Sequence, residues 1–231
     1  MAPPDAAGGD GTVAVFGAAS LRKAFTEISG RFEADNPGSA VESTFAGSAD
    51  LLSQLTQGAP ADVLATADAA TMDKAALAGL TEGSPVDFAA NTLTIVVAPG
   101  NPRRVGSFRD LDRPGLAVVL CAPQVPCGAA TVMLERATGV NLDPVSEESQ
   151  VTDVLTKVIS GQADAGVVYS TDARAAGEKV SEVAVPESPV NRYRIAMVKG
   201  ARNPGAARKF IEFVSGAAGQ QALAAAGFRR P

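Results

Sequence analysis

Short apolar segments along the chain alternate with longer segments in which apolar residues recur every three or four positions. The first apolar segment, TVAVF (12–16), has the composition of a buried β-strand. The apolar residues that follow it share one face of a helix, and they are Leu21, Ala24, Phe25, Ile28 and Phe32. The pattern therefore predicts a strand followed by an amphipathic helix.

The same alternation continues to the end of the sequence. We predict further strands at 40–45, 61–66, 92–98, 115–121, 163–170, 180–186 and 193–199. Helices are predicted at 48–58, 69–79, 128–139, 149–161, 203–216 and 217–227. Because strands that alternate with helices form mainly parallel sheets, the predicted fold class is α/β.

Two long apolar strands indicate how the chain divides. The strands at 92–98 and 193–199 bracket a self-contained block of about ninety residues. We therefore expect two lobes, each a mainly parallel sheet flanked by helices, joined by two crossing strands. The expected parts are a flexible tail at 1–11, a first lobe at 12–90 and 196–231, a second lobe at 91–195, and hinge strands near 91–98 and 191–198.

Composition and charge exclude several classes of function. The formal net charge of −5 argues against nucleic-acid binding, which needs a basic surface. No apolar run approaches the roughly 20 residues of a membrane span. Histidine is absent, which removes Ser–His and Cys–His catalysis and most catalytic zinc sites. We therefore expect a protein that is not an enzyme and holds no cofactor.

The two cysteines lie close together in the segment CAPQVPCG, at Cys121 and Cys127. Without histidine they cannot complete a zinc site, and their spacing is not that of a Cys-x-x-Cys motif. Two alternatives stay open at this point, a short-loop disulfide in an exported protein or a pair of buried thiols.

The junctions between strands and helices carry the candidate chemistry, because ligands of open α/β sheets bind beyond the carboxyl ends of the strands. The residues at these junctions are Ser20 after VFGAA, Ser48 after TFAG, Cys127 after the strand GLAVVLC, Val151 in the first turn of a helix, and Tyr169 at the end of AGVVY. First-turn N–H groups have no partner inside their helix, and hydroxyls can donate. The set therefore suits a small, fully ionised oxyanion.

Each of these residues also has an ordinary structural interpretation. A serine at the start of a helix often serves only as an N-cap. A tyrosine at the end of a strand often packs in the core with its hydroxyl in water. Only the joint arrangement of the five residues favours a binding site.

Several segments together resemble the motifs of periplasmic molybdate-binding proteins, the substrate-capturing components of ABC importers. They are VFGAASL, TFAGSADL, GAPADVLATAD, QVPCG and AGVVYSTDA, and the similarity runs from about Val13 to Phe228. The resemblance implies a two-lobed, type II periplasmic-binding-protein fold that closes on molybdate or tungstate. It also implies an ABC permease as the membrane partner.

The resemblance implies which residues of this sequence correspond to the ligand residues of the family. Ser20 and Ser48 match the two ligand serines of the family, Val151 matches a backbone donor, and Tyr169 matches a hydroxyl donor. Cys127 falls where the family commonly has alanine, and it is paired with Cys121 at another position without cysteine in the family. This pairing favours a disulfide that braces the ligand loop. We expect an extracytoplasmic monomer with a lipid anchor on a segment absent from this sequence.

Three alternative functions remain at this point. The first is a sulfate receptor, because sulfate and molybdate are both tetrahedral dianions; a phosphate receptor would need an acceptor such as Asp62 or Asp153. The second is an enzyme with Cys127 as its nucleophile. The third is a cytosolic sensor domain that acts with a separate partner chain.

Overall fold

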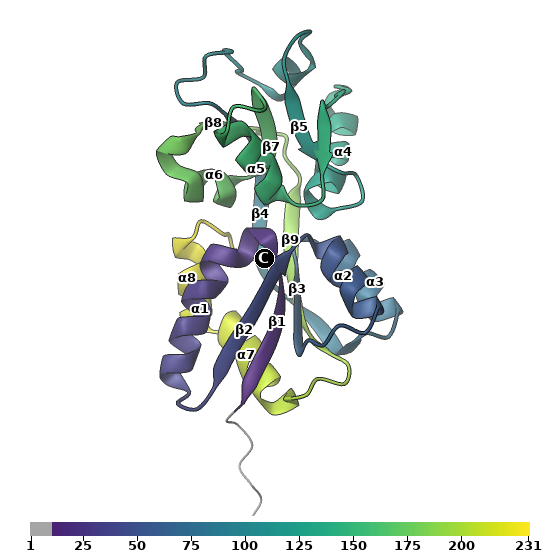
Figure 1. The fold of residues 1–231 in the computed structure, drawn as a ribbon, viewed down its shortest axis with the longest axis vertical. Coiled ribbons are helices and arrows are strands. Elements are labelled where there is room, and N and C mark those ends of the chain that lie inside the picture. Colours follow the sequence, from purple (N-terminus) through teal and green to yellow (C-terminus); the bar gives the residue numbers. More distant parts are fainter. Residues whose placement is uncertain (1–10) are drawn as a thin grey trace, which may run out of the picture.

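A computed structural model of the chain describes residues 11–231. The predicted flexible tail at 1–11 lies outside the described residues except for Gly11. Two lobes are stacked along the long axis of the molecule, and strands β4 and β9 pass from one to the other (Figure 1). Both sheets are mixed, and helices flank them, which confirms the predicted α/β fold class.

The first lobe is built on the strands β1 (Thr12–Ala18), β2 (Ala40–Ala46) and β3 (Val63–Thr66), which run parallel. Strand β9 (Val190–Val198) pairs antiparallel with β3. The helices of this lobe are α1 (Arg22–Asp35), α2 (Ser48–Thr56), α3 (Ala69–Leu77), α7 (Pro204–Ser215) and α8 (Ala217–Ala225), and a 3₁₀ turn, η1 (Ala19–Leu21), precedes α1. This lobe therefore uses both ends of the chain.

The second lobe is built on the parallel strands β5 (Val118–Cys121), β6 (Ser146–Glu148) and β7 (Ala165–Tyr169). Its helices and turns are η2 (Phe108–Asp112), α4 (Pro126–Thr138), α5 (Val151–Ile159), α6 (Ser170–Ala176) and η3 (Gly177–Lys179). Strand β4 (Thr81–Val97) pairs antiparallel with β7 and with β8 (Ser181–Val183). Each lobe thus combines a parallel core with antiparallel strands at its border.

Strands β4 and β9 form the antiparallel ribbon that joins the lobes, with pairing from Thr81–Val198 to Thr92–Val190. The prediction that the first long strand begins at residue 92 is wrong, because it begins at Thr81. The polar strand β6 was not predicted, and the strand predicted at 180–186 is confined to Ser181–Val183. The predicted lobe boundaries stay predictions, because the pairing of the ribbon runs across them.

The core of the first lobe confirms the helical face predicted from the sequence. Leu21, Ala24, Phe25, Ile28 and Phe32 are all buried. The ring of Phe25 packs edge-on against that of Phe210 in α7 and lies 5.8 Å from that of Phe88 in β4. This packing fixes α1 at the end of β1, where Ser20 lies. Within residues 11–231 no helix is both long and apolar enough to cross a membrane.

Candidate oxyanion-binding site

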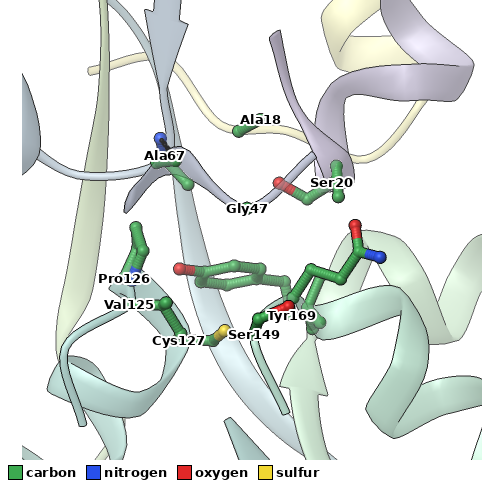
Figure 2. Close-up of a pocket in the computed structure, with 13 residues that line it drawn as sticks. Ala18, Ser20, Gly47, Ala67, Val125, Pro126, Cys127, Ser149 and Tyr169 are labelled. Atoms are coloured by element: carbon green, nitrogen blue, oxygen red, sulfur yellow. Dashed lines mark hydrogen bonds between the residues drawn. The ribbon is translucent and has the colours of Figure 1, made fainter. Parts of the chain in front are cut away.

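All five residues proposed from the sequence lie around one cavity between the two lobes, with a volume of about 20 Å³. Figure 2 shows residues of the first lobe on one side of it and residues of the second lobe on the other. Besides Ser20, Ser48, Cys127, Val151 and Tyr169, the lining residues are Ala18, Ala19, Gly47, Ala67, Val125, Pro126, Ser149 and Gln150. This volume is far below the roughly 300 Å³ at which pockets for drug-sized molecules begin, so the cavity suits a small ion.

Ser48 is the first residue of α2, and it is almost fully buried. Its hydroxyl does not cap the helix; Gly47 occupies the N-cap position. Instead, Ser48 Oγ accepts a hydrogen bond of 3.1 Å from the N–H of Ala67, which follows β3. With an acceptor position occupied in this way, the hydroxyl proton of Ser48 is free to point into the cavity.

Ser20 lies in the turn η1, two residues before the start of α1, so the expectation that it opens that helix needs correction. No side-chain hydrogen bond from Ser20 caps the helix. Ser20 Oγ lies 2.9 Å from Tyr193 Oη, so the interpretation of either serine as a plain N-cap is wrong.

The second lobe contributes helix starts whose side chains face the core. Pro126 and Cys127 are the first two residues of α4, and Val151 is the first residue of α5, with Gln150 as its N-cap. The side chains of Cys127 and Val151 are buried. Each can therefore offer only its backbone N–H, which as a first-turn group has no partner within the helix.

A disulfide joins Cys121 at the end of β5 to Cys127 in the first turn of α4, with a Cα–Cα distance of 5.7 Å. The turn between them is tight. A Cβ at Gly128 would lie 1.9 Å from the carbonyl oxygen of Ala122, so only glycine fits there. The Cys127 thiol is consumed by the disulfide, which removes the nucleophile that a Cys127-dependent enzyme would need.

Tyr169 closes the cavity from the end of β7, where its side chain is fully enclosed. Tyr169 Oη accepts a hydrogen bond of 3.0 Å from Asn191 Nδ2. Burial raises the pKa of the Tyr169 hydroxyl well above its ordinary value. The hydroxyl therefore keeps its proton at any physiological pH and can donate it to a ligand.

The two lobes approach each other most closely at Gly47. A Cβ placed on Gly47 would lie 2.3 Å from the backbone carbonyl oxygen of Ser149, on the opposite lobe. The backbone of Gly47 has φ −58° and ψ 140°, values that any residue can adopt. Glycine is needed here for interlobe space rather than for backbone freedom, and the structure is that of a closed form.

No ionisable side chain other than Tyr169 is among the lining residues in the described chain 11–231. Asp62 accepts hydrogen bonds from Ala14 N–H and Arg202 N–H in the first lobe, and Asp153 accepts one from Gln150 Nε2. Neither lines the cavity, so the suggestion that one of them supplies an acceptor for phosphate is wrong. The cavity instead presents donors to its ligand.

Three polar residues behind the cavity were missed in the sequence. Tyr193 on β9 contacts Ser20, while Asn91 on β4 and Asn191 on β9 lie opposite each other on the ribbon that joins the lobes. A weak signal was present, because Asn91 and Asn191 are polar residues at the ends of long apolar strands, and Tyr193 is one of only two tyrosines.

Comparisons with known proteins agree with this geometry. Residues 13–229 match the family model of bacterial extracellular solute-binding proteins. The molybdate-binding protein ModA of Mycobacterium tuberculosis is 54% identical over 222 residues, which cover 95% of this chain and 85% of that protein.

Two solved structures share the fold. The periplasmic molybdate-binding protein of Azotobacter vinelandii has a TM-score of 0.84 at 23% identity, covering 95% of this chain and 99% of that one. The sulfate-binding protein SubI of Mycobacterium tuberculosis has a TM-score of 0.86 at 20% identity, covering 95% and 86%. From its match over nearly the whole length, this chain belongs to the family of bacterial extracellular solute-binding proteins.

Proposed function

We propose that this protein captures molybdate between its lobes and delivers it to the permease of an ABC importer. The observation that carries the proposal is the cavity itself, which is small, lies between the lobes, and is lined by residues of both lobes that can offer hydroxyl and N–H donors. The 54% identity to a protein named for molybdate binding supports the choice of ligand.

The donor set explains how an acidic protein binds an anion. The net charge of −5 repels anions at long range, so attraction must come from local dipoles. The starts of α2, α4 and α5 line the cavity, and helix N-termini carry partial positive charge. Hydrogen bonds to a charged group contribute about 1.5–3 kcal/mol each, so several of them together support micromolar or tighter binding.

The ligand also explains the closed form. An oxyanion that bonds to Ser20 and Ser48 on one lobe and to Cys127, Val151 and Tyr169 on the other is held only when the lobes meet. Its binding therefore shifts the population toward the closed conformation. We infer that the permease recognises this closed shape.

Molybdate and sulfate differ mainly in size, so cavity dimensions decide between them. Tungstate should bind nearly as molybdate does. A sulfate receptor remains the second candidate, because the sulfate-binding protein SubI shares the fold. An enzymatic function has little support, because Cys127 is tied in a disulfide and the chain contains no histidine.

The setting of the protein follows from the same proposal. A receptor for an importer acts outside the cytoplasm, where a disulfide such as Cys121–Cys127 persists. The lipid anchor and the monomeric state stay predictions from the sequence.

Calorimetric titration of the ligand-free protein with molybdate, sulfate and phosphate tests the proposal. We expect submicromolar binding of molybdate and at least hundredfold weaker binding of sulfate, by the size argument. Equal binding of sulfate would leave an oxyanion receptor but overturn the molybdate assignment. Absence of binding by all three anions would overturn the receptor function.

A further inference from the structure

Two hydroxyls that line the cavity, those of Ser48 and Tyr169, accept a hydrogen bond from behind. Ser48 Oγ accepts from Ala67 N–H at 3.1 Å, and Tyr169 Oη accepts from Asn191 Nδ2 at 3.0 Å. The third hydroxyl, Ser20 Oγ, lies 2.9 Å from Tyr193 Oη. A hydroxyl has one proton, so accepting from behind leaves that proton for the cavity.

The direction of the bond between Ser20 and Tyr193 follows from the surroundings of Tyr193. Tyr193 is fully buried, and its Oη lies 3.5 Å from Asn91 Nδ2, which can only donate. Ser20 Oγ lies closer to Tyr193 Oη than Asn91 Nδ2 does, at 2.9 Å, and we infer that the Tyr193 hydroxyl donates its proton to it. Burial also raises the pKa of Tyr193 far above its ordinary value, so this donor does not ionise.

The orientation of both asparagine amides is fixed by a neighbouring backbone group. Asn91 Oδ1 accepts from Thr92 N–H at 3.0 Å, which turns Asn91 Nδ2 toward Tyr193 and toward Thr171 Oγ1, 2.7 Å away. Asn191 Nδ2 lies 3.4 Å from the carbonyl oxygen of Ala67, an obligate acceptor. Neither amide can be reversed without placing two acceptors or two donors against each other.

The two asparagines lie directly opposite each other on β4 and β9, and both are buried. Asn191 connects Ala67 of the first lobe to Tyr169 of the second. Asn91 connects Tyr193, the partner of Ser20, to Thr171 in α6 of the second lobe. Both halves of the site are therefore linked through one pair of amides on the ribbon that joins the lobes.

We propose that Asn91 and Asn191 are positioning residues that hold the site hydroxyls as donors toward the cavity and connect that orientation to the closed arrangement of the lobes. Because the hydroxyls then turn their protons toward the cavity, the site disfavours oxyanions that carry a proton of their own. A P–OH or similar group would meet a donor where it needs an acceptor. The proposal rests on the oxyanion-receptor function and explains its selectivity.

The test replaces each amide by an apolar side chain of similar size, in Asn191→Leu and Asn91→Leu. Tyr193→Phe is the milder variant, because it removes the donor to Ser20 and keeps the ring that packs against Phe228. Thr94→Val is the control, because Thr94 is buried on the same strand but bonds to Val183 O, away from the cavity.

Two quantities are measured for each variant, the Kd of molybdate and the Kd of phosphate at pH 7. A general loss of structural support would weaken the binding of both anions by the same factor. Loss of hydroxyl orientation should weaken molybdate binding by about tenfold. It should also let a freed hydroxyl accept a hydrogen bond from the proton of phosphate. We therefore expect the selectivity for molybdate over phosphate to fall by about tenfold or more in the three site variants and to stay unchanged in Thr94→Val.

Intrinsic fluorescence gives an independent readout, because the chain has no tryptophan and its only tyrosines are Tyr169 and Tyr193. The centres of their rings lie 5.9 Å apart, and Tyr169 lines the cavity. Molybdate binding should therefore change the tyrosine emission of the wild type, and this change should be smaller in Asn191→Leu.

The results distinguish a failure of the positioning role from a failure of the receptor function. An unchanged selectivity ratio in Tyr193→Phe and in the folded asparagine variants, with normal molybdate binding by the wild type, would overturn the positioning role alone. A wild type that binds no oxyanion would overturn the receptor function and this inference with it.

Discussion

The two halves of the site are built on different principles. The first lobe offers the side-chain hydroxyls of Ser20 and Ser48, which lie beside small residues and bond to groups behind them. The second lobe offers the backbone N–H groups of Cys127 and Val151, whose side chains are buried in its core. Tyr169 is the side-chain donor that we assign to this lobe.

This difference separates binding from stability. A hydroxyl donor on the first lobe can be removed with little loss of apolar burial, so the cost to stability is limited to the hydrogen bond that the hydroxyl makes behind the cavity. A backbone donor on the second lobe cannot be removed by substitution at all, whereas changing its side chain damages the core. Substitutions should therefore affect affinity on one side of the cavity and folding on the other.

The largest effect is expected where the halves touch, in Gly47→Ala. The new methyl group would lie 2.3 Å from the carbonyl oxygen of Ser149, a rigid backbone atom. The lobes could no longer close, so molybdate would lose the donors of the second lobe. We expect affinity to fall by at least about a thousandfold, equal to ~4 kcal/mol, in calorimetric titration.

Gly30→Ala is the matched control, because a Cβ at Gly30 meets nothing within 4 Å. Gly30 lies inside α1, so alanine there should raise the free energy of unfolding by about 0.5–1 kcal/mol and leave affinity unchanged. Wild-type affinity in Gly47→Ala would show that the lobes do not need to approach this closely.

A buried carboxyl lies behind Tyr169, outside the cavity lining, and Asp172→Asn tests its protonation. Burial raises the pKa of Asp172 to about 7, although its carboxylate accepts from Tyr169 N–H at 3.2 Å. Since the folded protein holds this proton more tightly than the unfolded chain, stability falls as pH rises from about 4 to about 7. The full effect is about 4 kcal/mol at most.

The asparagine in Asp172→Asn can still accept a hydrogen bond from Tyr169 N–H, but its side chain does not ionise. Urea unfolding of both proteins between pH 4 and pH 8 should show the wild type losing stability relative to Asp172→Asn as pH rises. Parallel pH profiles would mean that the carboxyl titrates normally.

A matched pair of substitutions tests the central contrast. Ser48→Ala removes a donor and should weaken molybdate binding by about 1–3 kcal/mol, and loss of the bond from Ala67 N–H should lower the free energy of unfolding by about 1 kcal/mol. Val151→Ala keeps its backbone N–H and should lower the free energy of unfolding by about 2 kcal/mol with nearly normal affinity. Ser48→Ala should therefore show the larger effect in a binding titration, and Val151→Ala should show the larger effect in an unfolding curve.

The smallest effect concerns the disulfide of the second lobe. Replacing both Cys121 and Cys127 by alanine should lower the free energy of unfolding by about 2 kcal/mol at most, through loss of loop closure. Affinity should fall by less than about tenfold, because the hydrogen bond from Val125 N–H to Ala122 O still holds the turn. A larger loss of affinity would mean that the disulfide itself positions the donor at residue 127.

Local patterns in the sequence were sufficient for much of this architecture. The apolar face of α1 follows from a spacing of three and four residues, which is a property of the helix itself. The positions of Ser20, Ser48 and Tyr169 near strand ends were also local features. Their convergence follows from a rule of α/β topology, and the resemblance to a family identified which junctions matter.

The parts that escaped prediction depend on distant partners. Strand β4 begins at Thr81, in a segment with glycine and proline, because β9 pairs with it across irregularities near Val86 and Ala89. Strand β6 is polar and lies at the end of the strand order next to β5, so no apolar pattern marked it. The contact between Asn91 and Tyr193 joins residues 102 positions apart, and no local signal encodes it.

The use of both chain ends in the first lobe has a consequence for biogenesis. The ring of Phe25 packs against Phe210, and that of Tyr193 packs against Phe228, so this core is incomplete until the last helices exist. The second lobe is continuous in sequence and can fold earlier during synthesis. A chain that ends before α7 would therefore carry the disulfide-braced half of the site on a folded lobe, while Ser20 and Ser48 would have no finished scaffold beneath them.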